Sequence, residues 1–273
     1  MLEVVESLVV GKHADEASCE DGIVATAQYV AVIDGATTEP GHELAGRSPG
    51  RFAMETLSDA IHALDPDADA ESAVGELSQA LADALARHGG RPGELASACI
   101  LVASARRGQV WRVGNSTFAI DGAAYPQHWS LAEIPSRMRS AYLQALLRAG
   151  TTTIEDVQEH DPGAELIAPL LRIERVFRNR PDAGELAYTA VDGLEVPPTL
   201  IERVDLPTEA EVVFASDGYP VLAPTLAEAE DYLRTSLAED PLRIHRHPEV
   251  RGVARGCVSY DDRAYVRFRV REN

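Results

Sequence analysis

Three acidic dipeptides lie where apolar segments of the chain begin or end. They are Asp34-Gly35 after the run 29–33, Asp217-Gly218 after the run 212–215, and Asp261-Asp262 before the run 264–270. A carboxylate where a strand leaves the core is unfavourable unless it is solvated, hydrogen-bonded or bound to a cation. A glycine beside it permits a sharp turn and a close backbone approach. If these acids meet at one edge of a sheet, they form an oxygen-rich site of the kind that Mg²⁺ and Mn²⁺ prefer.

A second interpretation of the same acids is purely structural. Asp-Gly is a common turn dipeptide, so each acid could be a turn residue or a helix cap. Most of the 44 acidic residues of the chain are expected to be solvated surface groups. Each dipeptide alone therefore favours a turn, and only their combination with the surrounding sequence favours a metal site.

The elements that would position these acids follow from the apolar pattern. Alternating or continuous apolar runs predict strands, and apolar residues at helical spacing, with Pro and Gly at suitable ends, predict helices. The predicted strands are 4–5, 8–10, 23–25, 29–33, 98–103, 109–113, 116–120, 185–191, 200–204, 212–215, 256–259 and 264–270, and the predicted helices are 51–64, 70–88, 130–148, 164–178 and 226–238. Asp121-Gly122 predicts a tight turn.

The order of these elements predicts an α+β fold. Strands, two helices, strands, helices and strands follow one another, which differs from the strand–helix alternation of a doubly wound sheet. No internal repeat or low-complexity linker interrupts the chain, so we expect one domain over residues 1–273. Residues 149–163 are the best candidate for an exposed, flexible segment.

Composition excludes several classes of function. The net charge of −19 disfavours a nucleic-acid partner. No apolar run approaches the ~20 residues that span a bilayer, and the first residues are acidic where a secretory signal is basic, so we expect a cytoplasmic protein that is not bound to a membrane. Cys19, Cys99 and Cys257 are scattered, which disfavours a disulfide framework or a zinc site, and Cys99 is expected in the core.

Four segments, in order, resemble the PP2C-type family of metal-dependent serine/threonine protein phosphatases, in its bacterial form. CEDGIVATAQYVAVIDGAT resembles the opening of that family, with Glu20-Asp21 before two strands and Asp34-Gly35 after them. SACILVASARRGQVWRVGNSTFAIDG resembles the hairpin that usually ends in VGDSR, EAEVVFASDGYPVL resembles the block around LLLASDGL, and SYDDRAYVRFRV resembles the SxDN block and last strand. The resemblance spans about residues 8–270.

The resemblance implies a fold, a pair of metal ions and a reaction. The fold would be a β-sandwich flanked by helix pairs in four layers, α-β-β-α. Two Mg²⁺ or Mn²⁺ ions, with a third as an open alternative, would be held by acids of the four segments. The implied metal ligands are Glu20, Asp21 (behind the direct ligands), Asp34, the carbonyl of Gly35, Asp217 and Asp261, of which Asp34, Asp217 and Asp261 form the catalytic core. Two such ions activate a water molecule for in-line attack on phosphorus.

The sequence departs from that family at four places. Ala36 replaces the histidine that often follows Asp-Gly, Thr37-Thr38 offer no substitute for an imidazole, and His42 is only a weak candidate for the general acid. Glu16 replaces a phosphate-binding arginine, and Lys12, His13, Arg47 and Arg51 are the candidate cations. Asn115 replaces an aspartate with an expected structural role. Asp262 replaces an asparagine and is either a ligand of a third metal or a surface turn acid.

These features leave three hypotheses for the function. The first is a metal-dependent phosphatase that hydrolyses phosphoserine or phosphothreonine in a phosphoprotein, or a small phosphate ester. The second is a catalytically weak or silent module of the same fold that binds a partner or a phosphorylated ligand. The third is an unrelated α+β domain in which the Asp-Gly turns coincide.

Overall fold

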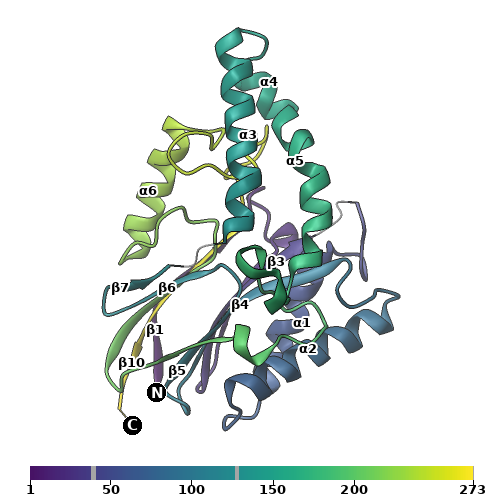
Figure 1. The fold of residues 1–273 in the computed structure, drawn as a ribbon. Coiled ribbons are helices and arrows are strands. Elements are labelled where there is room, and N and C mark those ends of the chain that lie inside the picture. The colour runs from purple at the N-terminus through teal and green to yellow at the C-terminus, as the bar shows by residue number, and fades with distance from the viewer. Residues whose placement is uncertain (38–40, 127–128, 273) are drawn as a thin grey trace.

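The computed structural model describes residues 1–37, 41–126 and 129–272. Two antiparallel five-stranded sheets pack face to face, and helices cover the outer faces (Figure 1). Sheet I has the order β1-β10-β9-β6-β7 and sheet II the order β2-β3-β4-β5-β8. The α+β sandwich with flanking helices is therefore confirmed.

The strands are β1 (Leu2–Val10), β2 (Asp21–Ala25), β3 (Tyr29–Thr37), β4 (Ala96–Ser104), β5 (Gln109–Val113), β6 (Thr117–Ile120), β7 (Ala123–Tyr125), β8 (Glu202–Asp205), β9 (Ala210–Ala215) and β10 (Arg263–Val270). The helices are α1 (Pro49–Ala63), α2 (Ala70–Arg87), α3 (Ser130–Ala149), α4 (Ile154–Glu159), α5 (Pro162–Ile173) and α6 (Leu226–Glu239).

The central strands are buried on both faces, which explains their continuous apolar runs. In β3, Val30 and Val32 point into the core between the two sheets, whereas Ala31 and Ile33 point toward α1 and α2. Residues on the inner face of sheet I, such as Phe214, pack against them in the same core cluster. Because side chains alternate along a strand, this pattern also decides which way the acids at the strand ends point.

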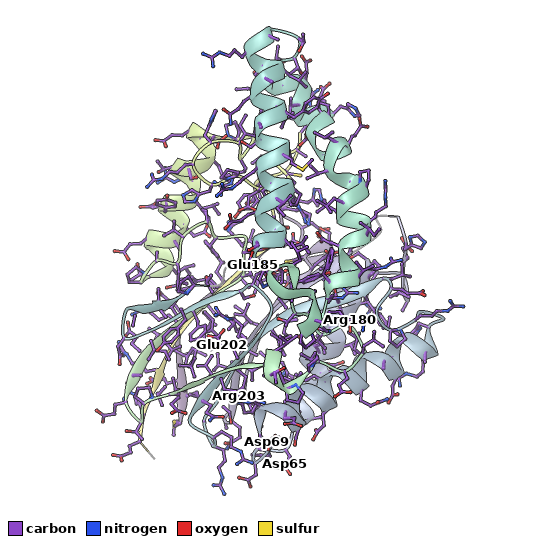
Figure 2. The ribbon with its side chains drawn as sticks, viewed as in Figure 1. Asp65, Asp69, Arg180, Glu185, Glu202 and Arg203 are labelled. Carbon is purple, nitrogen blue, oxygen red and sulfur yellow. The ribbon has the colours of Figure 1, made fainter. Side chains whose placement is uncertain are left out.

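The helix pair α1 and α2 covers the outer face of sheet II. Ser48 caps α1 by accepting a hydrogen bond from the amide of Arg51, and Pro49 occupies the first turn. Asp69 caps α2 in the same way and lies with Asp65 at the base of the molecule (Figure 2). Helix α6 packs on the outer face of sheet I, and α3 to α5 project beyond the sandwich (Figure 1).

Four predictions of local structure are wrong in detail. Residues 185–191 form no strand, because Gly184 has a positive φ of 61° and the Asn179 side chain bonds the backbone of Ala190. Residues 256–259 form turns, beginning at Gly256 with a φ of 84°. The helix predicted over 164–178 ends at Ile173 and continues as a 3₁₀ turn, and the segment 149–163 contains helix α4.

The remaining local predictions concern cysteines, the hairpin turn and membrane helices. All three cysteines are free, and Cys99 is buried in β4. Asp121 and Gly122 connect β6 to β7 with φ values of 49° and 79°, as the tight turn requires. Within the described ranges, no helix is both long and apolar enough to cross a bilayer.

Candidate functional site

Strand parity sends four side chains to one end of the inter-sheet core. Asp34 follows Val30 and Val32, whose side chains point between the sheets, and Asp21 pairs with Asp34 across β2 and β3. From sheet I, Ser216 follows Phe214 with the same parity, and Asp262 precedes the inward-facing Ala264. Asp217 and Asp261 lie next to these positions, so carboxylates from both sheets converge at this end.

The carboxyl groups of Asp34 and Asp217 lie close enough to interact directly. Desolvation by the surrounding protein, and then repulsion from Asp217, Asp21 and Asp261, raise the pKa of Asp34 well above its usual range. Desolvation and then repulsion from Asp261 raise the pKa of Asp217 to about 6. Negative charge is therefore in excess at this contact, and a bound cation would relieve the repulsion between the carboxylates.

Asp21 is the most buried member of the group. Its residue is 4% exposed, the Ser216 hydroxyl hydrogen-bonds its carboxyl, and its Oδ2 atom has no hydrogen-bond partner within the described part of the chain. Burial, opposed by that hydrogen bond and assisted by repulsion from Asp261 and Asp217, raises its pKa well above the usual range. We call Asp21, Asp34, Asp217 and Asp261 the acid cluster.

Glu20 is held against the start of α1. Its Oε1 atom accepts a hydrogen bond of 2.6 Å from the Thr37 hydroxyl, which itself accepts one of 2.9 Å from the amide of Gly50. The amide of Gly35 donates to the carbonyl of Glu20 at 3.0 Å. The Glu20 carboxylate therefore has a defined position beside Asp34-Gly35.

The Asp34-Gly35 dipeptide is not a turn, because β3 continues to Thr37. Gly35 is required by close packing: a Cβ atom there would lie 2.2 Å from the carbonyl oxygen of Gly50 and 2.7 Å from that of Glu20. Gly218, by contrast, belongs to a turn after β9, and a Cβ atom there would lie 2.0 Å from the carbonyl oxygen of Asp262. The expectation of a strand end is thus wrong for Asp34 and holds for Asp217.

The two neighbouring aspartates before β10 have different environments. Asp262 is 3% exposed and accepts hydrogen bonds from the backbone amides of Lys12 (2.7 Å) and Glu20 (3.0 Å) and from the Lys12 ammonium (3.2 Å). It is therefore not a surface turn acid, because it joins the segments before β2 and β10. Asp261 is more exposed and pairs with Arg251 at 3.3 Å and with Lys12 at 3.6 Å.

The other predicted cations have partners away from the acid cluster. Arg51 donates to the carbonyls of Glu16 and Cys19 and pairs with Glu55. Arg47 also pairs with Glu55, and the imidazole Nδ1 of His13 lies 3.3 Å from the thiol of Cys257. His42 and Ala36 are exposed, and Thr38 lies outside the described residues.

The donor set of this site fits a hard divalent cation. The ligand types are oxygens, their charges repel one another, and Asp21 offers a buried oxygen without a partner. Among residues 1–37, 41–126 and 129–272, however, no three His, Cys, Asp or Glu side chains are already arranged to hold an ion. The predicted ligands lie near one another, but their binding of metal stays a prediction.

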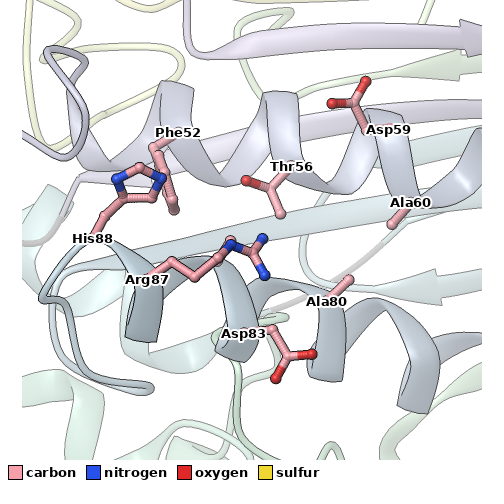
Figure 3. Close-up of a pocket in the computed structure, with 9 residues that line it drawn as sticks. Phe52, Thr56, Asp59, Ala60, Ala80, Asp83, Arg87 and His88 are labelled. Carbon is pink, nitrogen blue, oxygen red and sulfur yellow. The ribbon is translucent and has the colours of Figure 1, made fainter.

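The sequence analysis did not predict two contacts of this site. Asn115, for which we expected only a structural role, donates a hydrogen bond of 3.0 Å to Asp217. Arg251 lies in an irregular loop, and no pattern in the sequence places it near Asp261. A surface groove between α1 and α2, lined by residues such as Asp59, Asp83 and Arg87, contains none of the predicted acids (Figure 3).

The fold is that of the PP2C-type serine/threonine phosphatases, as comparison with solved structures shows. One match is the serine/threonine phosphatase PstP/Ppp of Mycobacterium tuberculosis, with 20% identity, 99% of each chain covered and a TM-score of 0.53. Another is the catalytic domain of PstP in complex with two manganese ions, with 19% identity, 100% of each chain covered and a TM-score of 0.52. No family model and no curated protein matches the sequence.

Proposed function

We propose that this protein is a phosphatase that depends on Mg²⁺ or Mn²⁺ and hydrolyses phosphoserine or phosphothreonine esters in proteins. The observation that carries the proposal is the convergence of Asp21, Asp34, Asp217 and Asp261 at one end of the sandwich. The similar PstP catalytic domain holds two manganese ions, which supports the choice of metal. A small phosphate ester remains an alternative substrate.

Each residue of the site has a proposed role. Asp34 would bridge two ions, Asp217 and Asp261 would hold one of them, and Glu20 and the carbonyl of Gly35 would face the other. Asp21 would stay behind these ligands, where it accepts from Ser216. Thr37 fixes the Glu20 carboxylate and Asn115 orients Asp217. When bound, the metal pair would lower the pKa of a water molecule and offset charge on the phosphoryl oxygens.

A second function has a specific observation in its favour. Ala36 supplies no proton donor for the leaving alcohol, and Lys12 and Arg251 already neutralise Asp261. A silent module that binds a phosphorylated ligand without turnover is consistent with both features. The two functions differ in whether bound metal produces hydrolysis.

Hydrolysis of p-nitrophenyl phosphate and of a phosphothreonine peptide, with Mn²⁺ or with EDTA, tests the proposal. We expect turnover with Mn²⁺ that falls at least ~100-fold in Asp34→Asn and in Asp217→Asn, because each loses a charged ligand. Asp205→Asn, an exposed acid at the end of β8, is the matched control and should keep full activity. Calorimetric Mn²⁺ binding without turnover would favour the silent module, and absence of both would exclude a metal site.

A further inference from the structure

The loop between α6 and β10 is fixed by two buried arginines. Arg139 on α3 is fully buried, and its Nη1 atom donates to the carbonyls of Leu242 (2.9 Å) and Glu249 (3.0 Å). Arg243 is also fully buried and lies 4.6 Å above the ring of Tyr260. These contacts hold both ends of the segment that leads to Arg251.

The backbone around Arg251 is closely packed as well. A Cβ atom on the next residue, Gly252, would lie 2.8 Å from the Cα of Leu242, and the amide of Val253 donates to the carbonyl of Pro241 at 2.8 Å. The fold therefore fixes the backbone position of Arg251. Such fixed placement is what a side chain that binds substrate requires.

The guanidinium of Arg251 combines exposure with proximity to the acid cluster. Its side chain is 50% exposed, and its Nη1 atom lies 3.3 Å from Oδ1 of Asp261. The charges of Asp261, Asp217 and Glu20 all act on it and raise its pKa. Within the described ranges, its other nitrogen atoms donate to no side chain or carbonyl, so they are available to a ligand.

The neighbouring cations lack that availability. The Lys12 ammonium pairs with Asp262 at 3.2 Å, and the Lys12 side chain is only 21% exposed. Arg51 is bound to two carbonyl groups and to Glu55. Arg255, four residues along the same loop, pairs with Glu159 at the end of α4 instead of with the acid cluster.

We propose that Arg251 is the residue that binds the phosphoryl group of the substrate, a role that rests on the proposed phosphatase function. A planar guanidinium can donate two parallel hydrogen bonds to phosphoryl oxygens, which a lysine cannot do. It enters the site from the C-terminal loop, on the side of Asp261, and thereby replaces the cation that Glu16 cannot supply.

This placement has a second consequence for Asp261. Its Oδ1 atom is the partner of Arg251 and also belongs to a proposed metal ligand, so a divalent cation and the guanidinium compete for it. A metal ion bound at Asp261 would therefore weaken this ion pair and leave the guanidinium free to bind phosphate. Removing the guanidinium should therefore weaken phosphate binding while leaving Mn²⁺ binding equal or tighter.

The test uses full-length Arg251→Gln, with Arg251→Lys as the conservative variant and Arg255→Gln as the matched control on the same loop. In Arg251→Gln we expect the KM for p-nitrophenyl phosphate and the inhibition constant of inorganic phosphate to rise ~10-fold or more, as for loss of a charged hydrogen bond. The kcat of Arg251→Gln should change less than its KM, and its Mn²⁺ affinity, measured by calorimetry, should not fall. Arg251→Lys should recover part of the lost phosphate affinity, and Arg255→Gln should resemble wild type.

Binding of inorganic phosphate to the Mn²⁺-loaded protein, measured by calorimetry, separates this inference from the proposed function. One outcome is that wild type shows no turnover but still binds phosphate, with an affinity that falls ~10-fold in Arg251→Gln. That result would support the role of Arg251 in phosphate binding even though the proposed phosphatase activity had failed. Phosphate constants of Arg251→Gln within twofold of wild type would overturn it, as would wild type that binds no phosphate. A fall in Mn²⁺ affinity in Arg251→Gln would also overturn it, because Arg251 would then only support the metal site.

Discussion

Replacement of Asp262 by alanine should destabilise the protein more than replacement of its neighbour Asp261. Asp262 is buried and accepts from two backbone amides, those of Lys12 and Glu20, at 2.7 and 3.0 Å. A backbone amide that loses its only acceptor costs about 1–3 kcal/mol where water cannot reach it. The lost contact with the Lys12 ammonium adds at most about 1 kcal/mol, because that group is partly solvated.

These values predict a loss of about 2–4 kcal/mol in the free energy of unfolding for Asp262→Ala. The loss is smaller than the sum of the contacts because removing one negative charge also relieves repulsion with the acid cluster. The assay is urea unfolding followed by tryptophan fluorescence and circular dichroism at pH 7.5 in EDTA. Asp261→Asn is the control: it keeps an acceptor for the amide of Asp262 and should change stability by no more than about 0.5 kcal/mol.

The outcome decides between two roles for Asp262. A loss below about 1 kcal/mol in Asp262→Ala, or an equal loss in both variants, would refute the assignment of Asp262 to a buried backbone contact. Asp262→Asn should lie between wild type and Asp262→Ala, because one amide oxygen can serve one of the two amide donors.

Two further predictions concern packing and pH. Gly35→Ala should cost about 1–3 kcal/mol, because its Cβ would overlap the Gly50 carbonyl, whereas Gly75→Ala in α2, with open space around it, should stabilise by about 0.5–1 kcal/mol in the same urea assay. Burial, opposed by Arg178, raises the pKa of Glu174 to about 7. The fold therefore loses stability as pH rises from about 4.5 through 7. Because solvent screens this partly exposed group, Glu174→Gln should stabilise by about 1–2 kcal/mol at pH 8 and by less than about 0.5 kcal/mol at pH 5. An equal gain at both pH values would contradict this.

Local pattern was sufficient for most of the sandwich. The run 29–33 and the segment 109–113 were predicted as strands because their apolar side chains could only be buried. The helices after Ser48 and Asp69 could be predicted because cap residues and helical spacing agree there. These signals are local, so no knowledge of the partner surfaces was needed.

The same reasoning failed where a residue distant in the sequence hydrogen-bonds or packs against the backbone of a segment. Residues 185–191 have the composition of a strand, but the side chain of Asn179 takes the hydrogen bonds of Ala190 that a neighbouring strand would have made. Asp34-Gly35 has the composition of a turn, but the glycine is needed for the approach of Gly50, which is distant in the chain. Contacts of this kind leave no periodic signal.

The sequence by itself determined that acids would lie in or next to buried strands, where the period of a strand decides which side chains share a face. It therefore predicted oxygen ligands for a hard cation and named the residues to examine. Only the tertiary structure decided that Asp34 lies beside Asp217. It also decided that Asp262 accepts hydrogen bonds from backbone amides and that Arg251 pairs with Asp261. Those relations depend on how two sheets and a C-terminal loop pack, and packing joins residues that no spacing along the chain connects.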